Sequence, residues 1–384
     1  MGKRLNFKII GSGPTGLLLS IVLSNLDLNI YLTDLLSKKQ LINKDKTYAI
    51  THSTRKILMK FSIWNKLKPY LFGFDTLSIT DSVTSSHTLL TKSDLDKDIC
   101  HENMIGWVIK HSDLMNVFFQ EINNRDNIFF INPQKLALEK KFFDYEFIST
   151  GAQSVDKRFI NFLNFKKAYN QSCLTFKVLT RSNLKSRAYE IFRDEGPLAL
   201  LPLDDDLYQI IWTSNTSKSI DRLNTNKSFL LDNLSTILPK SFKLDQIVGE
   251  INIFPVSLSL NYHIFPLTKS VLVGDAFHTF HPVGGQGLNT CWRDVNTIYD
   301  ILSKCSNLSH KSLSLFKYKY YSRRFIDIVI TILVTDFLIK IFANRNLILF
   351  PLRKFSFLSL NKFRFIRKYI LNHMTKSFIY KSIK

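Results

Sequence analysis

Two glycine-rich segments, each associated with an aspartate, carry the residue types best suited to bind phosphate and sugar groups. Near the N-terminus, residues 11–16 read Gly-Ser-Gly-Pro-Thr-Gly, and Asp34 lies 23 residues beyond Gly11. Glycines permit a tight turn and a close approach to a pyrophosphate, and a carboxylate at this distance can bind an adenosine ribose. The segment predicts a dinucleotide site formed by Gly11, Ser12, Gly13, Pro14, Gly16 and Asp34.

The second segment of this kind covers residues 271–294. A short apolar stretch runs into Gly274 and Asp275, His281-Pro282 follows, and three glycines then precede a polar helix start. Asp275 can accept hydrogen bonds from a sugar-alcohol chain, and the free N–H groups of a helix start attract negative charge. We expect the same ligand to be bound by Gly274, Asp275, Pro282, Gly284, Gly285, Gln286, Gly287, Leu288 and Asn289.

The elements around these segments predict an α/β fold. Apolar residues 7–10 precede the first glycine loop, an apolar helix follows it, and a second strand ends at Asp34. A further helix is expected over residues 53–67. Between 165 and 255, short runs of β-branched and aromatic residues alternate with turns, which predicts a mainly antiparallel sheet. The expected fold is therefore a Rossmann-like domain interrupted by an antiparallel β domain, with a C-terminal helical segment broken at Pro351.

Composition indicates a globular protein with an anionic partner. Of 384 residues, 45% are hydrophobic and 22% charged, and lysine plus arginine exceed aspartate plus glutamate by 52 − 31 = 21. An abundance of Lys, Asn, Ile and Phe is also typical of a low-GC genome. The scattered cysteines, which predict neither disulfides nor a metal site, are Cys100, Cys173, Cys291 and Cys305.

The C-terminal segment combines positive charge with large apolar side chains. After Asp336 the chain has eleven lysines or arginines and no acidic residue, with phenylalanines, leucines and isoleucines between them. This pattern is typical of helices that lie on an anionic membrane surface, although it also fits a helical cap packed on the core. Three ionisable groups within residues 325–342 argue against a membrane span. We expect a cytoplasmic protein, peripheral at the cytoplasmic membrane, that does not bind nucleic acid.

Together, the two glycine-rich units resemble the class A flavin-dependent aromatic hydroxylases. The second unit, with Gly274-Asp275 and the run from His281 to Asn289, is similar to the second flavin motif of that family. Residues 188–203 and the later Tyr321…Arg324…Asp336 pattern are similar to its quinone-biosynthesis branch, the 2-octaprenyl-6-methoxyphenol hydroxylase-like proteins. The resemblance covers nearly the whole chain.

The resemblance implies FAD, with the pyrophosphate at the first glycine loop, the adenosine ribose at Asp34 and the ribitol at Asp275. The backbone from Gly284 to Asn289 would face the flavin ring edge, where a helix N-terminus stabilises negative charge. The implied reaction is ring hydroxylation of a lipophilic, prenylated phenol or quinone precursor with NAD(P)H and O₂. Because the cofactor supplies the chemistry, no catalytic side chain is assigned, and His278 and His281 are expected to pack or shape the turn.

The resemblance also implies a division of the chain. Segments 1–73, 101–164 and 261–305 would form a discontinuous FAD-binding domain. Segments 74–100 and 165–260 would form the substrate-binding sheet, and residues 306–384 the basic helical region.

Two positions depart from the pattern of the family. Lys46 stands where its members usually carry an arginine near the flavin, which keeps the charge but loses the bidentate fork. Thr150 stands where a mid-chain motif of the family has an aspartate, which supports both the pyrophosphate and the nicotinamide cofactor. In this sequence the later positions of the same motif are occupied by Gln153 and Lys157. Lys46 is retained as a cofactor-binding candidate, and Thr150 brings efficient use of NAD(P)H into question.

Two alternatives follow from these departures. One keeps the fold but changes the chemistry to a prenyl reductase, a halogenase or another flavin oxidoreductase. Trp107 stands alone in IGWVIK, so the W-x-W-x-I-P segment of halogenases is missing. The other alternative is a catalytically impaired flavoprotein that acts as a membrane-associated assembly subunit, a possibility raised by Thr150.

Overall fold

The computed structural model describes residues 4–97, 99, 102–134, 142–152, 164–181, 186–240, 242–261, 269–305 and 310–376. Cys100, Gln153 and Lys157 lie outside these ranges. Cys173, Cys291 and Cys305 are free thiols.

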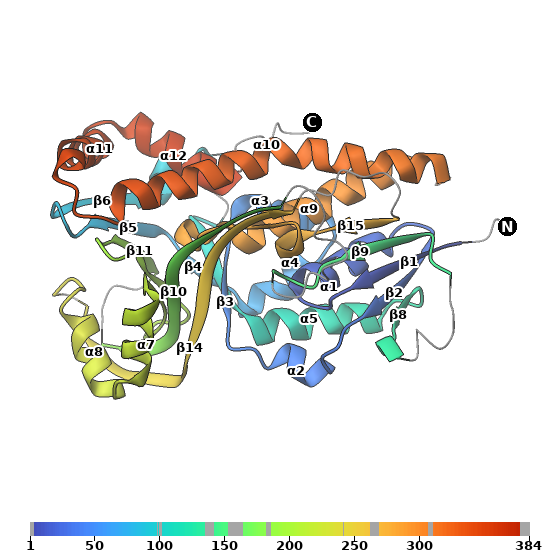
Figure 1. Cartoon of the computed structure of the whole chain (residues 1–384), viewed down its shortest axis with the longest axis horizontal. Helices are drawn as coiled ribbons and strands as arrows, with labels where there is room; N and C mark the ends of the chain where they lie inside the picture. Colours follow the sequence, from blue (N-terminus) through green and yellow to red (C-terminus); the bar gives the residue numbers. More distant parts are fainter. Residues whose placement is uncertain are drawn as a thin grey trace.

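A five-stranded, wholly parallel sheet has the N-terminal strand at its centre (Figure 1). Its order is β15 (Ser270–Leu272), β9 (Tyr145–Ile148), β1 (Leu5–Ile10), β2 (Leu28–Thr33) and β8 (Ile128–Phe130). One apolar core joins this sheet to α1 (Pro14–Leu23), α5 (His111–Asn123) and α9 (Gln286–Leu302). Because α1 packs on both other helices, its residues from Gly16 to Leu23 are all buried, which explains why its sequence is apolar all round.

An eight-stranded, mainly antiparallel sheet forms the other half of the molecule. Its strands, in spatial order, are β16 (His278–Thr279), β14 (Leu244–Asn261), β10 (Asn164–Thr180), β13 (Leu207–Asn215), β12 (Leu198–Pro202), β11 (Arg187–Phe192), β5 (Thr76–Asp81) and β6 (Ser86–Thr91). Buried and half-buried residues alternate along β12, as expected for a sheet with two different faces. One face packs with α8 (Lys227–Ser235) in an apolar cluster around Trp212.

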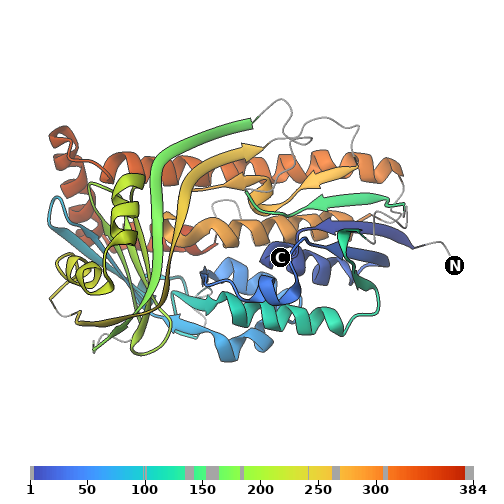
Figure 2. The same cartoon turned by 60° about the horizontal axis from the view of Figure 1, so that its bottom comes forward.

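Smaller elements connect these two sheets. A three-stranded antiparallel sheet consists of β3 (Thr47–Ile50), β7 (Gly106–Lys110) and β4 (Phe72–Phe74). Helices α2 (Lys38–Ile42), α3 (His52–Lys60) and α4 (Trp64–Leu67) complete this part of the chain, whereas α7 (Thr216–Asn224) packs on β10, β13 and β14 of the eight-stranded sheet. Long strands β10 and β14 run side by side from α7 and α8 towards the parallel sheet (Figures 1 and 2).

The C-terminal helices cover both halves of the molecule. Helix α10 (His310–Phe342) runs along the length of the molecule in both views (Figures 1 and 2). Phe316, near its start, packs on Tyr145 and Phe147 of the parallel sheet, whereas Phe342, at its end, stacks on Phe192 of β11. Helices α11 (Phe350–Lys362) and α12 (Arg364–Lys376) follow. No helix in the described ranges is long and apolar enough to cross a membrane.

The predicted fold class is confirmed: a parallel-sheet nucleotide-binding architecture is interrupted by an antiparallel sheet and ends in helices. Two local predictions were wrong. The single helix expected over 53–67 is interrupted at Ser62, whose φ of 60° lies outside the helical region. The C-terminal break lies before Pro351, not at it, because proline is favourable in the first turn of α11.

Candidate active site

A cavity of about 1360 Å³ extends from the carboxyl ends of the parallel strands to the antiparallel sheet. The residues after β1, β2 and β9 all contribute to its wall. The chain continues from β1 to β2 on one side of the parallel sheet, whereas β9 and β15 lie on the other side. Strand β1 is therefore a topological switch point, where open parallel sheets bind their ligands.

The glycines of the first loop have two different functions. Gly11 has φ of 102°, and a Cβ atom there would lie 2.6 Å from the backbone of Ser149. A Cβ atom on Gly16 would lie 1.8 Å from the carbonyl oxygen of Gly11, so both positions require glycine for packing. Gly13 has nothing within 4 Å of its Cβ position and lines the cavity with Pro14. The loop therefore leaves open space at Gly13, which fits the approach of a pyrophosphate.

Asp34 lines the cavity and also fixes this loop. Its carboxylate accepts hydrogen bonds from the backbone N–H groups of Ser12 at 2.6 Å and Leu36 at 2.9 Å. A carboxylate has about four lone-pair sites, so two bonds to the protein leave capacity for ribose hydroxyls. Ser12 itself does not line the cavity: its side chain is buried.

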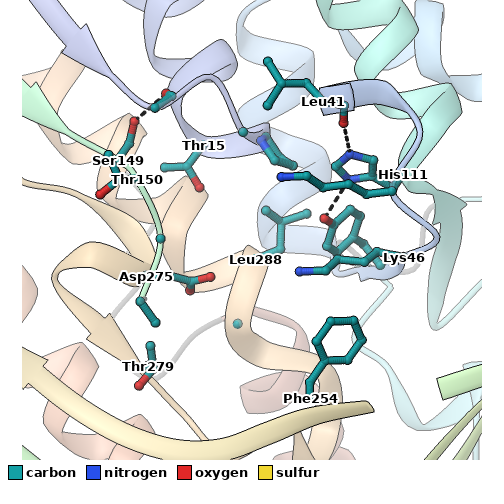
Figure 3. Close-up of a pocket in the computed structure, with 18 of the residues that line it drawn as sticks. Thr15, Leu41, Lys46, His111, Ser149, Thr150, Phe254, Asp275, Thr279 and Leu288 are labelled. Carbon is teal, nitrogen blue, oxygen red and sulfur yellow. Dashed lines mark hydrogen bonds between the residues drawn. The ribbon is translucent and has the colours of Figure 1, made fainter. Parts of the chain in front are cut away.

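Gly274 and Asp275 stand opposite this loop. Gly274 has φ of 64° and packs against Thr15 and Cys291, and its N–H donates to Asp294 at 3.1 Å. Asp275 is exposed to the cavity (Figure 3). Its carboxylate accepts a hydrogen bond from the Cys291 thiol at 3.3 Å. The cavity wall therefore holds two carboxylates, Asp34 after β2 and Asp275 after β15.

The glycine turn before α9 opens directly onto the cavity. Gly284 and Gly285 have φ of 70° and 61°, in the left-handed region that favours glycine. The N-cap of α9 has no side-chain hydrogen bond, and the Cβ positions of Gly284 and Gly287 have nothing within 4 Å. The start of α9 therefore presents N–H groups and open space to a ligand, and its dipole favours negative charge.

The remaining candidates of this segment divide into two groups. Pro282, Gly285, Gly287 and Leu288 line the cavity. Gln286 instead donates to the carbonyl oxygens of Gly284 and Met374. Asn289 is buried: it donates to Ala49 and Gly285 and accepts from the Thr54 hydroxyl at 2.7 Å. Its side chain therefore holds α9 against the β3–α3 connection instead of facing the cavity.

Lys46 lies in the cavity wall with its ammonium group 5.0 Å from the centre of the Phe254 ring (Figure 3). Burial lowers the pKa of Lys46, and the negative charge of Asp275 partly opposes this effect. The amine expected to supply positive charge at this position therefore lies beside the cavity.

Sequence reasoning missed a hydrogen-bonded pair next to Lys46. The Nε2 atom of His111 lies 2.7 Å from the Leu41 carbonyl oxygen, which can only accept, so this nitrogen carries the proton (Figure 3). The Nδ1 atom of His111 then accepts a hydrogen bond from the Tyr48 hydroxyl at 2.9 Å. Burial lowers the pKa of His111 to about 4 and raises that of Tyr48. Both groups are therefore neutral at neutral pH.

Thr150 lines the cavity immediately after β9, together with Gly151 and Ala152. The neighbouring Ser149 hydroxyl donates to the carbonyl oxygen of Gly11 at 2.8 Å and so joins this segment to the first glycine loop. The departure at residue 150 thus lies beside the predicted pyrophosphate position.

The antiparallel sheet supplies the far wall, which the local motifs could not reveal. Its contributing residues come from β10, β12, β13 and β14 and are Cys173, Thr175, Leu201, Gln209, Ile211, Phe254, Pro255, Val256 and Ser257. Most of these side chains are apolar or uncharged. The cavity therefore combines a polar end near α1 with a largely uncharged end on the sheet.

Two histidines predicted to pack or shape the turn have different surroundings. His281 lines the cavity, and its Nε2 atom lies 3.2 Å from Gln171. His278 is buried against Asp294 at 2.7 Å, away from the cavity wall. Within the described ranges, no three His, Cys, Asp or Glu side chains gather as metal ligands would.

Known proteins are similar in sequence to most of this chain. The family model described as squalene epoxidase matches residues 221–370. The uncharacterised protein slr1300 of Synechocystis is 26% identical over 369 residues, 90% of this chain and 87% of that protein. The mitochondrial ubiquinone biosynthesis monooxygenase COQ6 of Schizosaccharomyces pombe is 23% identical, with 96% of this chain and 91% of that protein aligned. The chain is thus similar to ubiquinone biosynthesis monooxygenases.

Solved structures share the fold of this chain at low sequence identity. The p-nitrophenol 4-monooxygenase PnpA of Pseudomonas putida superposes with a TM-score of 0.76, covering 98% of this chain and 99% of that one at 14% identity. HpxO of Klebsiella pneumoniae, solved with FAD and uric acid, gives a TM-score of 0.70 over 97% of both chains at 11% identity. The predicted resemblance is confirmed, and the predicted enzyme class, an FAD-dependent monooxygenase, is the class of these relatives.

Proposed function

We propose that the chain is an FAD-dependent monooxygenase that hydroxylates the ring of a prenylated phenol or quinone precursor, with NAD(P)H as reductant and O₂ as oxidant. The observation that carries the proposal is the continuity of the cavity from the first glycine loop, past Asp275 and the α9 N-terminus, to the antiparallel sheet. The polar end of this cavity is suited to bind a dinucleotide, and its largely uncharged end is suited to bind an apolar ring.

Different residues of the cavity wall would bind different parts of FAD and of the substrate. The open backbone at Gly13 would receive the pyrophosphate, while Asp34 and Asp275 would bind the two sugar portions. FAD would supply the redox chemistry. The α9 N-terminus would stabilise negative charge on its ring edge, and the uncharged sheet wall would orient the substrate and exclude water. In this proposal, segments 1–73, 101–164 and 261–305 hold FAD, and segments 74–100 and 165–260 hold the substrate.

Reconstitution followed by stopped-flow absorbance tests this function. The purified full chain is mixed with FAD, then with NADH or NADPH in the presence of a prenylated phenol, and products are analysed by mass spectrometry. We expect yellow protein, substrate-accelerated bleaching of the flavin, and a product heavier by one oxygen atom. Bound flavin that is bleached by neither nucleotide would favour the alternative of an impaired subunit and would assign the defect to Thr150. Restoration of bleaching by Thr150→Asp would confirm that assignment.

We further propose that the C-terminal helices contact an anionic membrane surface, from which a lipophilic substrate would enter. Ile348, just before α11, is 83% exposed, and Phe355 on α11 is 67% exposed. Further exposed apolar side chains on these helices are Leu333, Phe337, Leu347, Leu358, Phe365 and Tyr369. Exposed cations between them are Lys340, Arg345, Lys354, Lys362, Arg364 and Lys368. Each cation near such a surface contributes about 1 kcal/mol, and the apolar groups can enter the interface.

Point variants test this contact better than truncation, because α11 and α12 also hold the fold together. Arg353 of α11 is fully buried beside Asp81, and Arg367 of α12 binds Asp94 at 3.2 Å. We expect the native chain to sediment with vesicles that contain phosphatidylglycerol, and Ile348→Asp combined with Phe355→Asp to remain in the supernatant. The matched control is Phe229→Asp, which changes an exposed phenylalanine on α8. Equal sedimentation of all three proteins would contradict the proposal.

A further inference from the structure

The hydroxyl group of Tyr48, on β3 in the cavity wall, has a fixed hydrogen-bonding direction. It lies 2.9 Å from Nδ1 of His111. The Nε2 atom of His111 carries the ring proton, because its partner at 2.7 Å is the Leu41 carbonyl oxygen, which can only accept (Figure 3). In a neutral imidazole the other nitrogen is an acceptor. Tyr48 is therefore the donor, and its proton is committed to His111.

Further contacts hold this pair in place. The backbone N–H of His111 donates to the carbonyl oxygen of Lys46 at 2.8 Å, and the His111 side chain is buried. The centres of the Tyr48 and His111 rings lie 5.8 Å apart, and Tyr48 is paired in register with Ile109 of β7. Neither ring can turn without breaking a hydrogen bond, so the direction of the Tyr48 hydroxyl follows from the fold.

The oxygen of Tyr48 retains the capacity to accept a hydrogen bond. A phenol oxygen carries lone pairs besides its single proton, and none of the residues that the structure describes donates to this oxygen. The side chain is half-buried and lines the cavity. Burial at the cavity wall and the negative charge of Asp275 both raise the pKa of Tyr48, so the phenol stays protonated at neutral pH. Tyr48 thus offers a ligand an oxygen that accepts but does not donate.

Tyr48 lies next to the segment predicted to border the flavin. The Cβ atom of Ala49, the following residue, is 3.2 Å from the Cβ position of Gly285. The carbonyl oxygen of Ala49 accepts a hydrogen bond from Asn289 of α9 at 2.9 Å. Strand β3 is therefore held directly against the glycine turn, beside the position predicted for the ribitol chain at Asp275.

A sugar-alcohol chain needs acceptors at this position. Each of its hydroxyl groups has a proton to donate, and a hydroxyl that leaves water without an acceptor loses free energy. Asp275 supplies one acceptor on the wall of this cavity. The Tyr48 oxygen supplies a second one that carries no charge.

We propose that Tyr48 binds a hydroxyl group of the FAD ribitol chain through its acceptor oxygen, and that His111 is the positioning residue that keeps the phenol proton turned away from this ligand. The inference rests on the proposed function, because it requires FAD in the cavity. It assigns a binding role to two residues that belong to neither glycine-rich segment.

Titration of the full chain with FAD, and with FAD analogues that each lack one ribitol hydroxyl, tests the contact by flavin fluorescence. Tyr48→Phe removes the acceptor oxygen and keeps the ring, so FAD binding is expected to weaken about fivefold, as for one lost hydrogen bond. For the analogue that lacks the bonded hydroxyl, Tyr48→Phe and the native chain should bind equally, because neither forms the bond. The control Tyr299→Phe changes a partly buried tyrosine that does not line the cavity, and should match the native chain with every ligand.

Variants of His111 test the positioning role. His111→Leu removes the acceptor and releases the Tyr48 proton towards the ligand, which is expected to weaken FAD binding about threefold. The side-chain oxygen of His111→Asn lies near the position of Nδ1 and can accept from Tyr48, so this variant should recover most of the native affinity. Native affinity of His111→Leu would overturn the positioning role. Should His111→Leu fail to fold, His111→Phe, which also lacks an acceptor, replaces it with the same expected loss.

The outcomes separate this inference from the proposed function. If the native chain binds no FAD, both fail together. If the native chain binds FAD and Tyr48→Phe binds it with the same affinity, only the inference is overturned. An equal loss of affinity in Tyr48→Phe for FAD and for every analogue would also overturn it, because a general disturbance of the cavity does not depend on one hydroxyl group.

Discussion

Gly16 and Gly287 both lie in the first turn of a helix near the cavity, yet they meet different surroundings. A Cβ atom on Gly16 would overlap the carbonyl oxygen of Gly11, whereas one on Gly287 would enter open space. We expect Gly16→Ala to lower the free energy of unfolding by about 1–3 kcal/mol or more, through overpacking. Gly287→Ala should retain native stability but weaken FAD binding, because its methyl group occupies ligand space. Urea unfolding and FAD titration measure the two effects separately, and equal losses of stability would contradict this distinction.

Because burial lowers the pKa of His111, the free energy of unfolding should depend on pH. Its pKa is about 4 in the folded protein and near 6.5 when unfolded, so the unfolded chain binds more protons between these values. The stabilisation is therefore complete above pH 6.5 and is lost as the pH falls towards 4. We expect His111→Gln, whose amide can still donate to Leu41, to lose less stability than the native chain between pH 7 and pH 5. Part of the pH dependence of stability should remain in this variant, because the pKa of His281 is also lowered to about 4. Thermal unfolding at both pH values provides the measurement.

At the scale of elements, a buried ion network joins α10 to α9 and to the Gly274 segment. Arg324 of α10 contacts Asp294 and Asp327 at 2.6 Å each, and Arg293 contacts Asp327 at 3.0 Å. The same Asp294 accepts from the Gly274 N–H, so α10 supports the backbone beside Asp275. Arg324→Met leaves two buried carboxylates undercompensated and is expected to cost about 3–5 kcal/mol in urea unfolding. The control, Arg345→Met, breaks an exposed pair with Asp194 and should change stability by less than about 1 kcal/mol.

Elements with a local sequence signal, such as a glycine loop or an apolar period, could be predicted from the sequence. Positions that depend on contacts between distant segments could not. The β1–α1–β2 unit follows from its glycine loop and apolar periodicity, as does the start of α9. The positions of Tyr48, His111 and Phe254 come from three distant segments that meet only in the folded chain. The side chains of Gln286 and Asn289 belong to a predicted motif yet point away from the cavity, because neighbouring helices and loops supply their partners. Spacing identified the segment but could not give the direction of each side chain.

At the scale of the whole molecule, the cavity wall is assembled from both sheets, so a ligand in it should stabilise both. We expect FAD at one hundred times its dissociation constant to raise the free energy of unfolding by about 2.7 kcal/mol. Hydrogen exchange should slow in the loop after β1 and also in β10 and β14, which contribute to the opposite wall. Protection confined to the β1 loop would show that the ligand does not extend to the antiparallel sheet.

The order of strands in the parallel sheet also bears on how the chain is made. β15 is the only described strand that pairs with β9 on the side away from β1, and it is separated from β9 by more than a hundred residues of chain. At ribosomal rates of 5–20 residues per second, the newly synthesised β9 waits roughly 6–25 s for this neighbour. During that interval an apolar sheet edge is open to other nascent chains, so we expect holding chaperones to engage translation intermediates that stop short of residue 270.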